Sequence, residues 1–281
     1  MSWRKSIALL LVVSNPAAAG DYVLGGGIEG DSEDGLGVSL IGDLALSEHT
    51  WLSGSVAHNS VDVSNLPSTD TWYVDLGIDH WFDPVGVRAG AAYWGDSDIL
   101  DSNDWLASVY WRTNAMSLSA DYEYRDFTFK LPMTNMFPGR TLNFDANGFG
   151  LSARFNLTDD LSLSLSGMDY DYSDNLSLTD NDRLLDLLSF SRLSLINSLV
   201  DYSARAALGL NVGDQRWEFE AGTWKGEVDG GTTTSATIRF LTPLSAASDI
   251  EFGLGYDDSD LYGGVTFFSV YLYFYGAGEV S

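Results

Sequence analysis

The sequence predicts an all-β chain that closes into a transmembrane, antiparallel, up-and-down β-barrel after an N-terminal signal peptide. Three observations carry this prediction. Apolar and polar residues alternate with a period of two, the alternating segments are long, and tight turns alternate with long loops between them.

The N-terminal residues have the organisation of a secretory signal peptide. Arg4 and Lys5 precede an unbroken apolar run over 7–13, and small residues follow at Ala17 to Ala19. The run is too short to span a bilayer, although an N-terminal anchor helix is an alternative reading. We therefore predict cleavage near Ala19, with residues 1–19 removed and residues 20–281 forming one barrel domain.

The chain is strongly acidic, with a formal net charge of −26, and the predicted leader contributes only basic residues to that balance. Nucleic acid is excluded as a partner, because its phosphates require lysine and arginine. An acidic surface also repels anionic headgroups, so contact with outer-membrane lipids and lipopolysaccharide is expected to use divalent cations as bridges. The chain has no cysteine and therefore no disulfide framework.

Period-two alternation begins clearly at Leu36, where Leu36, Val38 and Leu40 are separated by Gly37 and Ser39. Such alternation gives a strand one apolar face and one polar face. The same pattern recurs over residues 72–79, 116–125, 149–157, 202–212, 217–221, 236–240 and 250–256.

Strand length separates a membrane barrel from a soluble β-sandwich, which remains the structural alternative. Sandwich strands run to about five or six residues, whereas a tilted strand that crosses a bilayer needs about nine to eleven. Four of the alternating segments, 36–46, 116–125, 149–157 and 202–212, are of the longer kind, and the polar faces carry full charges such as Glu123 and Arg125. A membrane barrel accommodates both faces, because lipid meets one and a polar lumen meets the other.

The connections alternate in length, as expected for short periplasmic turns opposite long external loops. Residues 241–248, with Pro243, fall on the periplasmic side and are expected to form a longer connection than this rule predicts. The count gives about fourteen strands, with twelve or sixteen as alternatives. The predicted tight turns are 47–50, 83–86, 113–114, 158–159 and 213–214, and the predicted longer loops are 30–35, 62–70, 95–104, 127–143, 173–198 and 257–263.

Aromatic residues gather near the ends of the predicted strands. Amphipathic rings at these positions are expected to form girdles at the two membrane interfaces. The tryptophans concerned are Trp51, Trp72, Trp81, Trp94, Trp105, Trp111 and Trp224.

The last strand, Thr266 to Tyr275 (TFFSVYLYFY), completes the pattern. From the leader to this strand the chain resembles the Gram-negative outer-membrane β-barrel proteins, as a broad porin-like class. The resemblance implies an integral protein of the cell outer membrane whose final strand is recognised by the barrel-assembly machinery. It further implies that recognition uses Phe268, Val270, Leu272 and Phe274, or the alternate set Tyr271, Tyr273 and Tyr275, with residues 276–281 following them.

The polar faces of the strands predict the lumen. Acids are in slight excess there, which favours a diffusion channel for small solutes or ions with a mild cation preference. The alternative is that these charges pair and fill a closed barrel that serves structure or surface interaction without transport. The predicted lumen-lining residues are Asp75, Asp79, Arg88, Arg112, Asp121, Glu123, Arg125, Arg154, Arg205, Glu218, Glu220, Arg239 and Glu251.

The residues 173–198 form the least regular part of the chain. Apolar side chains there, Leu184, Leu188, Phe190 and Leu195, predict a plug or rim segment, because so much apolar surface should not face water. The alternative is an external extension of the neighbouring strands.

Two candidate sites remain. The acidic stretch from Asp96 to Asp104 lacks the glycine and closing glutamate of an EF-hand, so we expect solvated loops and predict no metal or cofactor. His58 and Ser60, two apart on a strand, share one face, as a base and a nucleophile must. This His-x-Ser is similar to the short motif of lipid A deacylases, which makes an outer-membrane lipid hydrolase a lower-ranked hypothesis; the leading prediction is that the protein is not an enzyme.

Overall fold

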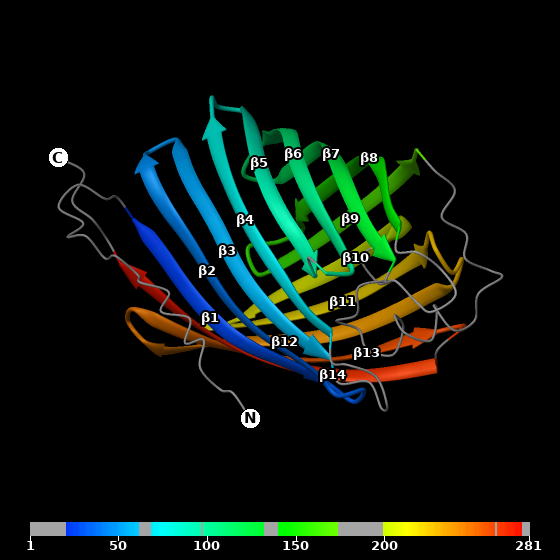
Figure 1. Ribbon diagram of the computed structural model, residues 1–281. Coiled ribbons are helices and arrows are strands. Elements are labelled where there is room, and N and C mark those ends of the chain that lie inside the picture. Colours follow the sequence, from blue (N-terminus) through cyan, green and yellow to red (C-terminus); the bar gives the residue numbers. More distant parts are fainter. Residues whose placement is uncertain are drawn as a thin grey trace.

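The computed structural model describes residues 21–61, 69–96, 98–131, 140–173, 199–261 and 263–276. These residues form fourteen antiparallel strands in one closed barrel (Figure 1). The predicted fold class and strand number are confirmed. The strands are β1 (Tyr22–Asp31), β2 (Gly35–Ser47), β3 (Thr50–Val61), β4 (Thr69–Trp81), β5 (Val85–Asp96), β6 (Leu100–Arg112), β7 (Met116–Leu131), β8 (Arg140–Asn156), β9 (Leu161–Tyr172), β10 (Val200–Val212), β11 (Gln215–Gly226), β12 (Thr232–Ser245), β13 (Ser248–Ser259) and β14 (Gly263–Gly276).

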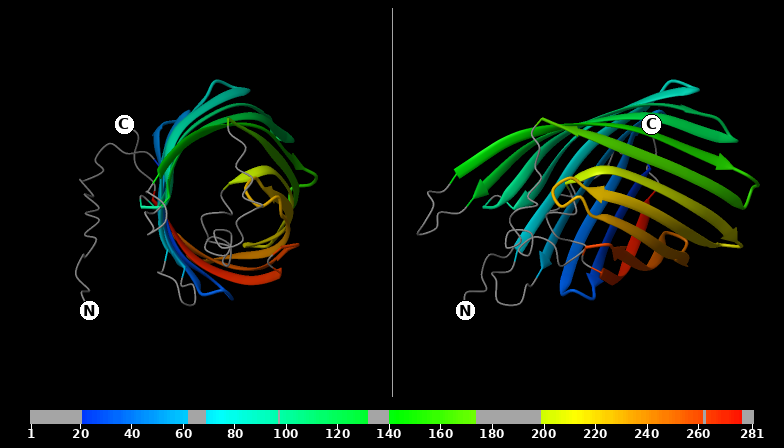
Figure 2. Two further views of the ribbon diagram at one scale, coloured as in Figure 1. Left: turned by 45° about the vertical axis from the view of Figure 1, so that its right-hand side comes forward. Right: turned by 90° about the vertical axis from the view of Figure 1, so that its right-hand side faces the viewer.

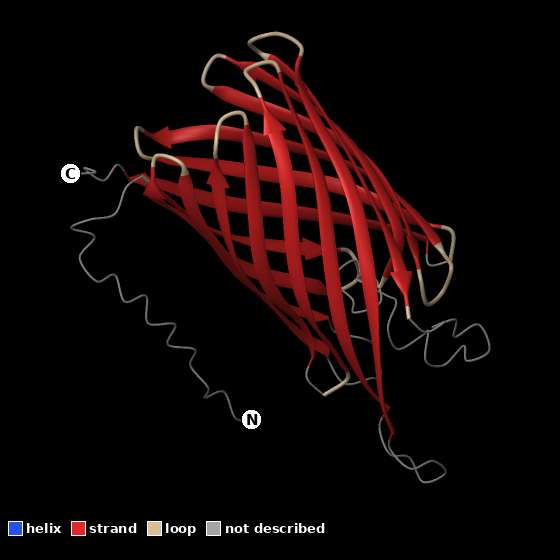
Figure 3. Cartoon of the chain, turned by 90° about the horizontal axis from the view of Figure 1, so that it is seen from above, coloured by secondary structure: helices blue, strands red, loops and turns tan. Residues whose placement is uncertain are grey.

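Each strand pairs with its neighbours in the chain, and β1 closes the barrel by pairing with β14 along its whole length. Tyr22 lies opposite Gly276, so the first and last strands meet at the same rim. Closure removes the open sheet edge whose amide groups lipid cannot satisfy. Figure 2 shows the resulting ring of strands around a lumen, and Figure 3 shows how strongly the strands are tilted. The predicted signal peptide lies outside the described residues.

The rim at which β1 begins carries the tight turns, and we call it the periplasmic rim. The turn after β10 is one of them, and Gly213 adopts a φ of 62° there, a conformation that glycine reaches without strain. The expectation of a longer connection over 241–248 was wrong, because β12 continues to Ser245 and β13 starts at Ser248. Pro243 stays within the strand, where the register shifts between Pro243 and Ser245 and a missing N–H is tolerated.

At the opposite, external rim the strands run further than the alternation predicted. Only residues 97–99 separate β5 from β6. Strand β7 continues to Leu131, and β8 starts at Arg140. The outward apolar pattern is lost here because the apolar residues, such as Leu100, Phe127 and Phe144, point inward instead. A further external connection, 227–231 between β11 and β12, was not among the predicted loops.

The outward face of the barrel is apolar over its central band. Leu76 and Leu151, for example, are 59% and 71% exposed although each lies in the interior of a strand. A band of this kind suits a hydrocarbon environment, and in water it would be an aggregation-prone surface. No helix long and apolar enough to cross a membrane occurs in the parts of the chain that the structure describes.

The aromatic girdles were predicted only in part. Trp105 points outward and is 61% exposed, as a girdle residue should be. Trp51 and Trp81 instead border a cavity on the inward face, and Trp94 is buried inside the barrel. Because successive side chains of a strand point to opposite faces, a ring near a strand end meets lipid or lumen according to a single residue of register.

Candidate channel lumen

The inward direction of the strands follows from their register. Leu76 and Ile78 are exposed outward, so their neighbours Asp75 and Asp79 point into the barrel. Asp79 lies opposite Arg88, and the same reasoning extends from strand to strand. It places all thirteen predicted lumen residues on the inward face: Asp75, Asp79, Arg88, Arg112, Asp121, Glu123, Arg125, Arg154, Arg205, Glu218, Glu220, Arg239 and Glu251.

Arg125 anchors a charge cluster in the external half of the lumen. Its Nε lies 3.4 Å from Oδ2 of Asp104 and 3.7 Å from Oε1 of Glu123. The Tyr170 hydroxyl donates a 2.7 Å hydrogen bond to Glu123, and the Ser102 hydroxyl donates to Asp104. The Arg125 side chain is only 8% exposed, so its two acids act as buried counter-ions.

Aromatic and aliphatic side chains cover this cluster. Phe127 is fully buried and stacks on Phe144 with ring centroids 4.8 Å apart, and the Arg125 guanidinium lies 4.7 Å from the Phe127 centroid. Leu199 and Val228 belong to the same buried group, so the start of β10 and the β11–β12 connection contribute to it. This external half is therefore partly filled by a small apolar core.

Glu227, in the connection that carries Val228, is tied to β10. Its N–H donates a 2.8 Å hydrogen bond to the carbonyl of Leu199. Burial, and then the nearby carboxylate of Asp201, raises the pKa of Glu227, while Lys225 opposes that rise. The carboxyl group thus keeps its proton to a higher pH than a free glutamate would.

A second charge cluster lies on β11 and β12. Arg239 Nη1 is 2.7 Å from Glu218 Oε1 and 3.4 Å from Glu220 Oε2, and Arg216 Nη2 is 3.3 Å from Glu218 Oε2. The Arg239 side chain is one-third exposed, so water shares in solvating this group. Arg239 pairs across from β12 to β11, whereas Arg216 and Glu218 lie two residues apart on β11, and both contacts hold an arginine side chain against the wall.

Other inward charges have no ion-pair partner among the described residues. Arg154 and Arg205, on β8 and β10, are of this kind, and each lies opposite a serine of β9 in the register. Asp75 accepts a hydrogen bond from Ser55, and Asp121 accepts one of 2.8 Å from Ser119, but neither carboxylate pairs with an arginine in those ranges. Such groups leave a net field in the lumen.

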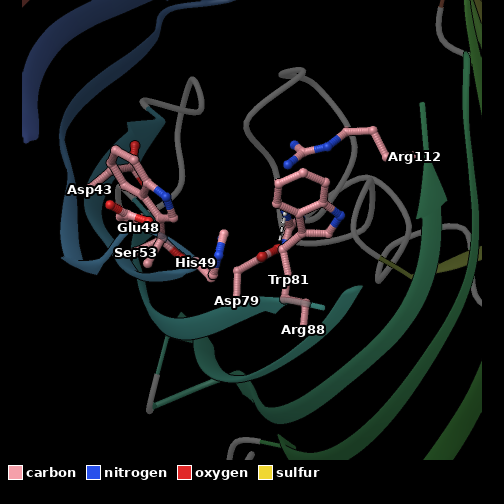
Figure 4. A pocket seen from close by; sticks show the side chains of 9 residues that line it. Asp43, Glu48, His49, Ser53, Asp79, Trp81, Arg88 and Arg112 are labelled. Atoms are coloured by element: carbon pink, nitrogen blue, oxygen red, sulfur yellow. Dashed lines mark hydrogen bonds and ion pairs between the residues drawn. The ribbon is translucent and has the colours of Figure 1, made fainter. Parts of the chain in front are cut away.

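Near the periplasmic rim, Asp79 takes part in a solvated counterpart of the Arg125 cluster. Arg88 Nη2 lies 3.2 Å from Oδ2 of Asp79, and the Tyr110 hydroxyl donates a 2.6 Å hydrogen bond to Oδ1. The Arg88 side chain is 61% exposed. A cavity of about 290 Å³ opens beside this group (Figure 4).

Sequence reasoning missed several residues that shape the lumen. Trp81 follows Asp79 by two positions, and that spacing alone places it on the inward face. Tyr110 and Tyr170 donate hydrogen bonds to lumen carboxylates. An even spacing from Arg112 and from Ser166 would have placed these two rings on the inward face as well. The aromatic rings were assigned to the membrane interfaces on composition instead of being assigned by parity.

His58 and Ser60 share a face, and the register places that face outward. They lie opposite Val38 and Leu36 of β2, near the external end of β3. His58 Nε2 is 3.8 Å from Oδ1 of Asp70, which is itself the cross-strand partner of Ser60. No hydrogen bond joins Ser60 to His58 within the described residues, so a base and a nucleophile are near one another without being engaged.

The acidic stretch from Asp96 to Asp104 does not converge on one point. Asp104 is buried against Arg125, whereas Asp101 lies 4.0 Å from Nζ of Lys130. Within the part of the chain that the structure describes, no group of three or more histidine or acidic side chains is arranged to hold a metal ion. The proposed plug residues Leu184, Leu188, Phe190 and Leu195 lie outside the described residues.

Solved structures share this architecture. CymD, a monoaromatic hydrocarbon channel, superposes with a TM-score of 0.55 at 10% identity, over 95% of this chain and 92% of its own. The fold is that of the outer-membrane porins and channels. A loop-deletion form of OmpT, an outer membrane protein of Vibrio cholerae, superposes on this porin-like barrel with a TM-score of 0.52 at 11% identity, over 92% of this chain and 99% of its own.

The likeness of this porin-like barrel to those structures is confined to the fold at such low identity. No family model matches the chain, and no curated protein sequence matches it. Function must therefore be argued from the side chains of the lumen and the outer face.

Proposed function

We propose that the protein is a porin-like diffusion channel of the outer membrane that passes small solutes or ions with a mild preference for cations. The observation that carries the proposal is the lining of the barrel. Charged and hydroxyl-bearing side chains occupy the inward face from Asp79 near the periplasmic rim to Glu123 in the external half. Several of them, such as Arg88, remain well exposed to solvent inside the barrel.

The cation preference rests on the balance of the inward charges. Asp43, Asp75 and Asp121 have no arginine partner among the described residues, and Arg154 and Arg205 are the corresponding arginines without an acid. Inward acids outnumber inward arginines over the described strands, with Glu29 and Glu251 counted among those acids. A lumen with a negative excess attracts cations through its field and lowers their barrier to entry.

Recording single channels of the refolded mature chain in a planar bilayer tests both parts. We expect discrete conductance steps and, under a potassium chloride gradient, a reversal potential on the cation side. Asp75→Asn should lower the cation preference and Arg205→Gln should raise it, because each removes one lumen charge that has no ionic partner among the described residues. A reversal potential that indicates anion selectivity would contradict the proposed cation preference.

A closed barrel without transport is the main alternative. The buried Arg125 cluster with Phe127 and Phe144 favours it, because that group fills part of the external half of the lumen. The same recordings decide the matter: a correctly folded wild-type barrel that gives no conductance steps would support the closed barrel.

A lipid hydrolase at the outer face is the second alternative. What favours it is the position of His58, Ser60 and Asp70 on the outward face near the external rim, where a lipid ester in the membrane would lie. Lipid A and phospholipid profiles of cells with the wild-type protein and with His58→Ala test it. Identical profiles would dismiss the hydrolase.

A further inference from the structure

The cavity near the periplasmic rim is built by consecutive strands, with β2 to β6 and the β2–β3 turn contributing to its wall. Its volume is about 290 Å³, which is at the lower end of the range for ligand sites and suits a small solute. The lining side chains are Asp43, Glu48, His49, Trp51, Ser53, Asp79, Trp81, Arg88 and Arg112 (Figure 4).

Part of the charge in this cavity is already neutralised by the protein. Asp79 binds Arg88 at 3.2 Å and accepts the Tyr110 hydroxyl at 2.6 Å, so this pair needs no ligand. The pair of Asp79 and Arg88 lies on β4 and β5, between Asp43 on β2 and Arg112 on β6. A solute therefore meets the remaining charges.

The remaining charges are of both signs and stand apart. Arg112 forms no ion pair with any described residue, and its guanidinium carbon lies 4.8 Å from the centroid of the Trp81 ring. Asp43 and Glu48 likewise form no ion pair in the described ranges. Figure 4 shows the two carboxylates on one side of the cavity and Arg112 on the other.

Aromatic rings line the space between these charges. Trp51 and Trp81 both border the cavity, and His49 meets Trp81 edge to face with ring centroids 5.6 Å apart. Aromatic surface of this kind packs against methylene groups, while a few polar groups fix the orientation of a ligand. The cavity thus offers an anion contact, a cation contact and an apolar surface between them.

We propose that this cavity is a binding station for small zwitterions, molecules that carry a carboxylate and an ammonium group joined by a few methylenes. The carboxylate binds the planar fork of Arg112, which suits bidentate recognition, and the ammonium group faces Asp43 and Glu48. A simple anion meets the two carboxylates unfavourably, and a simple cation meets Arg112 unfavourably. The inference rests on the proposed channel function, whose solute class it names.

Binding at such a station must be weak, on the order of millimolar, because a solute that passes through a channel has to leave it again. Ligand-observed NMR titration of the detergent-solubilised barrel measures affinities in this range. The probes are γ-aminobutyrate, its anionic analogue butyrate and its cationic analogue butylamine. We expect saturable binding of γ-aminobutyrate and at least fivefold weaker binding of the other two.

Variants locate the site. Arg112→Gln and Asp43→Asn should each weaken γ-aminobutyrate binding about tenfold, since each removes one charge-assisted contact. Arg112→Lys, which keeps the charge but loses the fork, should have an intermediate effect and guards against a folding defect in Arg112→Gln. Arg154→Gln is the matched control, because it removes a lumen arginine outside the cavity, and its affinity should stay within twofold of wild type.

The outcomes separate the site from the channel. Equal binding of butyrate or butylamine, or unchanged affinity in both cavity variants, would overturn the zwitterion station even if the barrel conducts. Absence of conductance together with selective binding of γ-aminobutyrate would overturn the channel and leave the site standing. Conductance together with selective binding that Arg112→Gln and Asp43→Asn both abolish would support the two proposals at once.

Discussion

An arginine, a carboxylate and a tyrosine come together twice inside this barrel, and the two groups differ in how far water reaches them. In the external half, Arg125 binds Glu123, and Tyr170 donates to that acid at 2.7 Å. Near the periplasmic rim, Arg88 binds Asp79, and Tyr110 donates to that acid at 2.6 Å. The arginine side chain is 8% exposed in the first group and 61% exposed in the second.

The surroundings account for the difference. Phe127, Phe144 and Trp94 cover the external group, so its charges lie in a poorly solvated environment and depend on one another. Water reaches the periplasmic group and screens its charges, so replacing any one of its side chains should cost little stability. The comparison teaches that a charged pair in a barrel lumen is a structural element where aromatic rings seal it, and that it contributes little to stability where water reaches it.

The largest expected effect is at Arg125. Arg125→Met should lower the free energy of unfolding by about 3–5 kcal/mol, because Asp104 and Glu123 would remain buried without their counter-ion. Urea-induced unfolding of the barrel in detergent micelles measures it. Adding Asp104→Asn and Glu123→Gln to the same chain should recover much of the loss, and a single variant as stable as wild type would break the comparison.

A smaller effect is expected at Tyr170. Tyr170→Phe should cost about 1.5–3 kcal/mol, since it removes a hydrogen bond to a shielded carboxylate and leaves the ring in place. The matched control is Tyr110→Phe, which removes the equivalent hydrogen bond in the solvated group and should cost under about 1 kcal/mol. Equal costs in the two variants, measured by the same unfolding titration, would mean that burial does not separate the two groups.

The smallest effect on stability is expected at Arg88. Arg88→Gln should change the free energy of unfolding by no more than about 1 kcal/mol, because the Arg88 side chain is 61% exposed to solvent. The substitution should instead act on conduction, raising the cation preference in planar-bilayer recordings by freeing the Asp79 carboxylate. A large loss of stability with unchanged selectivity would show that the periplasmic group is structural as well.

The fold was largely predictable from the strands that separate an apolar from a polar face. The segment from Leu36 to Leu46 shows this best, because Leu36, Val38 and Leu40 all face outward and are 44–54% exposed. Prediction failed where the apolar residues change to the inward face. Phe127 and Phe129 extend β7 into a region expected to be a loop, and they point inward while Thr128 and Lys130 point outward, so the apolar face of the strand is reversed there.

The candidate site was predictable as a list of inward charges and not as an arrangement. The thirteen residues expected in the lumen all lie on the inward face, because parity along a strand is a local property. The rings that border the cavity at Trp51 and Trp81 were assigned to membrane girdles, although Trp81 lies two residues from Asp79 on β4 and so shares its face. His58 and Ser60 were correctly expected to share a face, but the side of the barrel on which they lie required the register.

The sequence by itself determined that the chain forms long two-faced strands, that they must close, and that the inner face is charged. These properties follow from period-two alternation and from the need of every backbone amide for a partner in lipid. Only the tertiary structure decided which charges meet, which are sealed by aromatic rings and where a cavity remains. Those outcomes depend on the register between strands far apart in the chain, as with Arg125, Asp104 and Tyr170, and no single strand encodes that register.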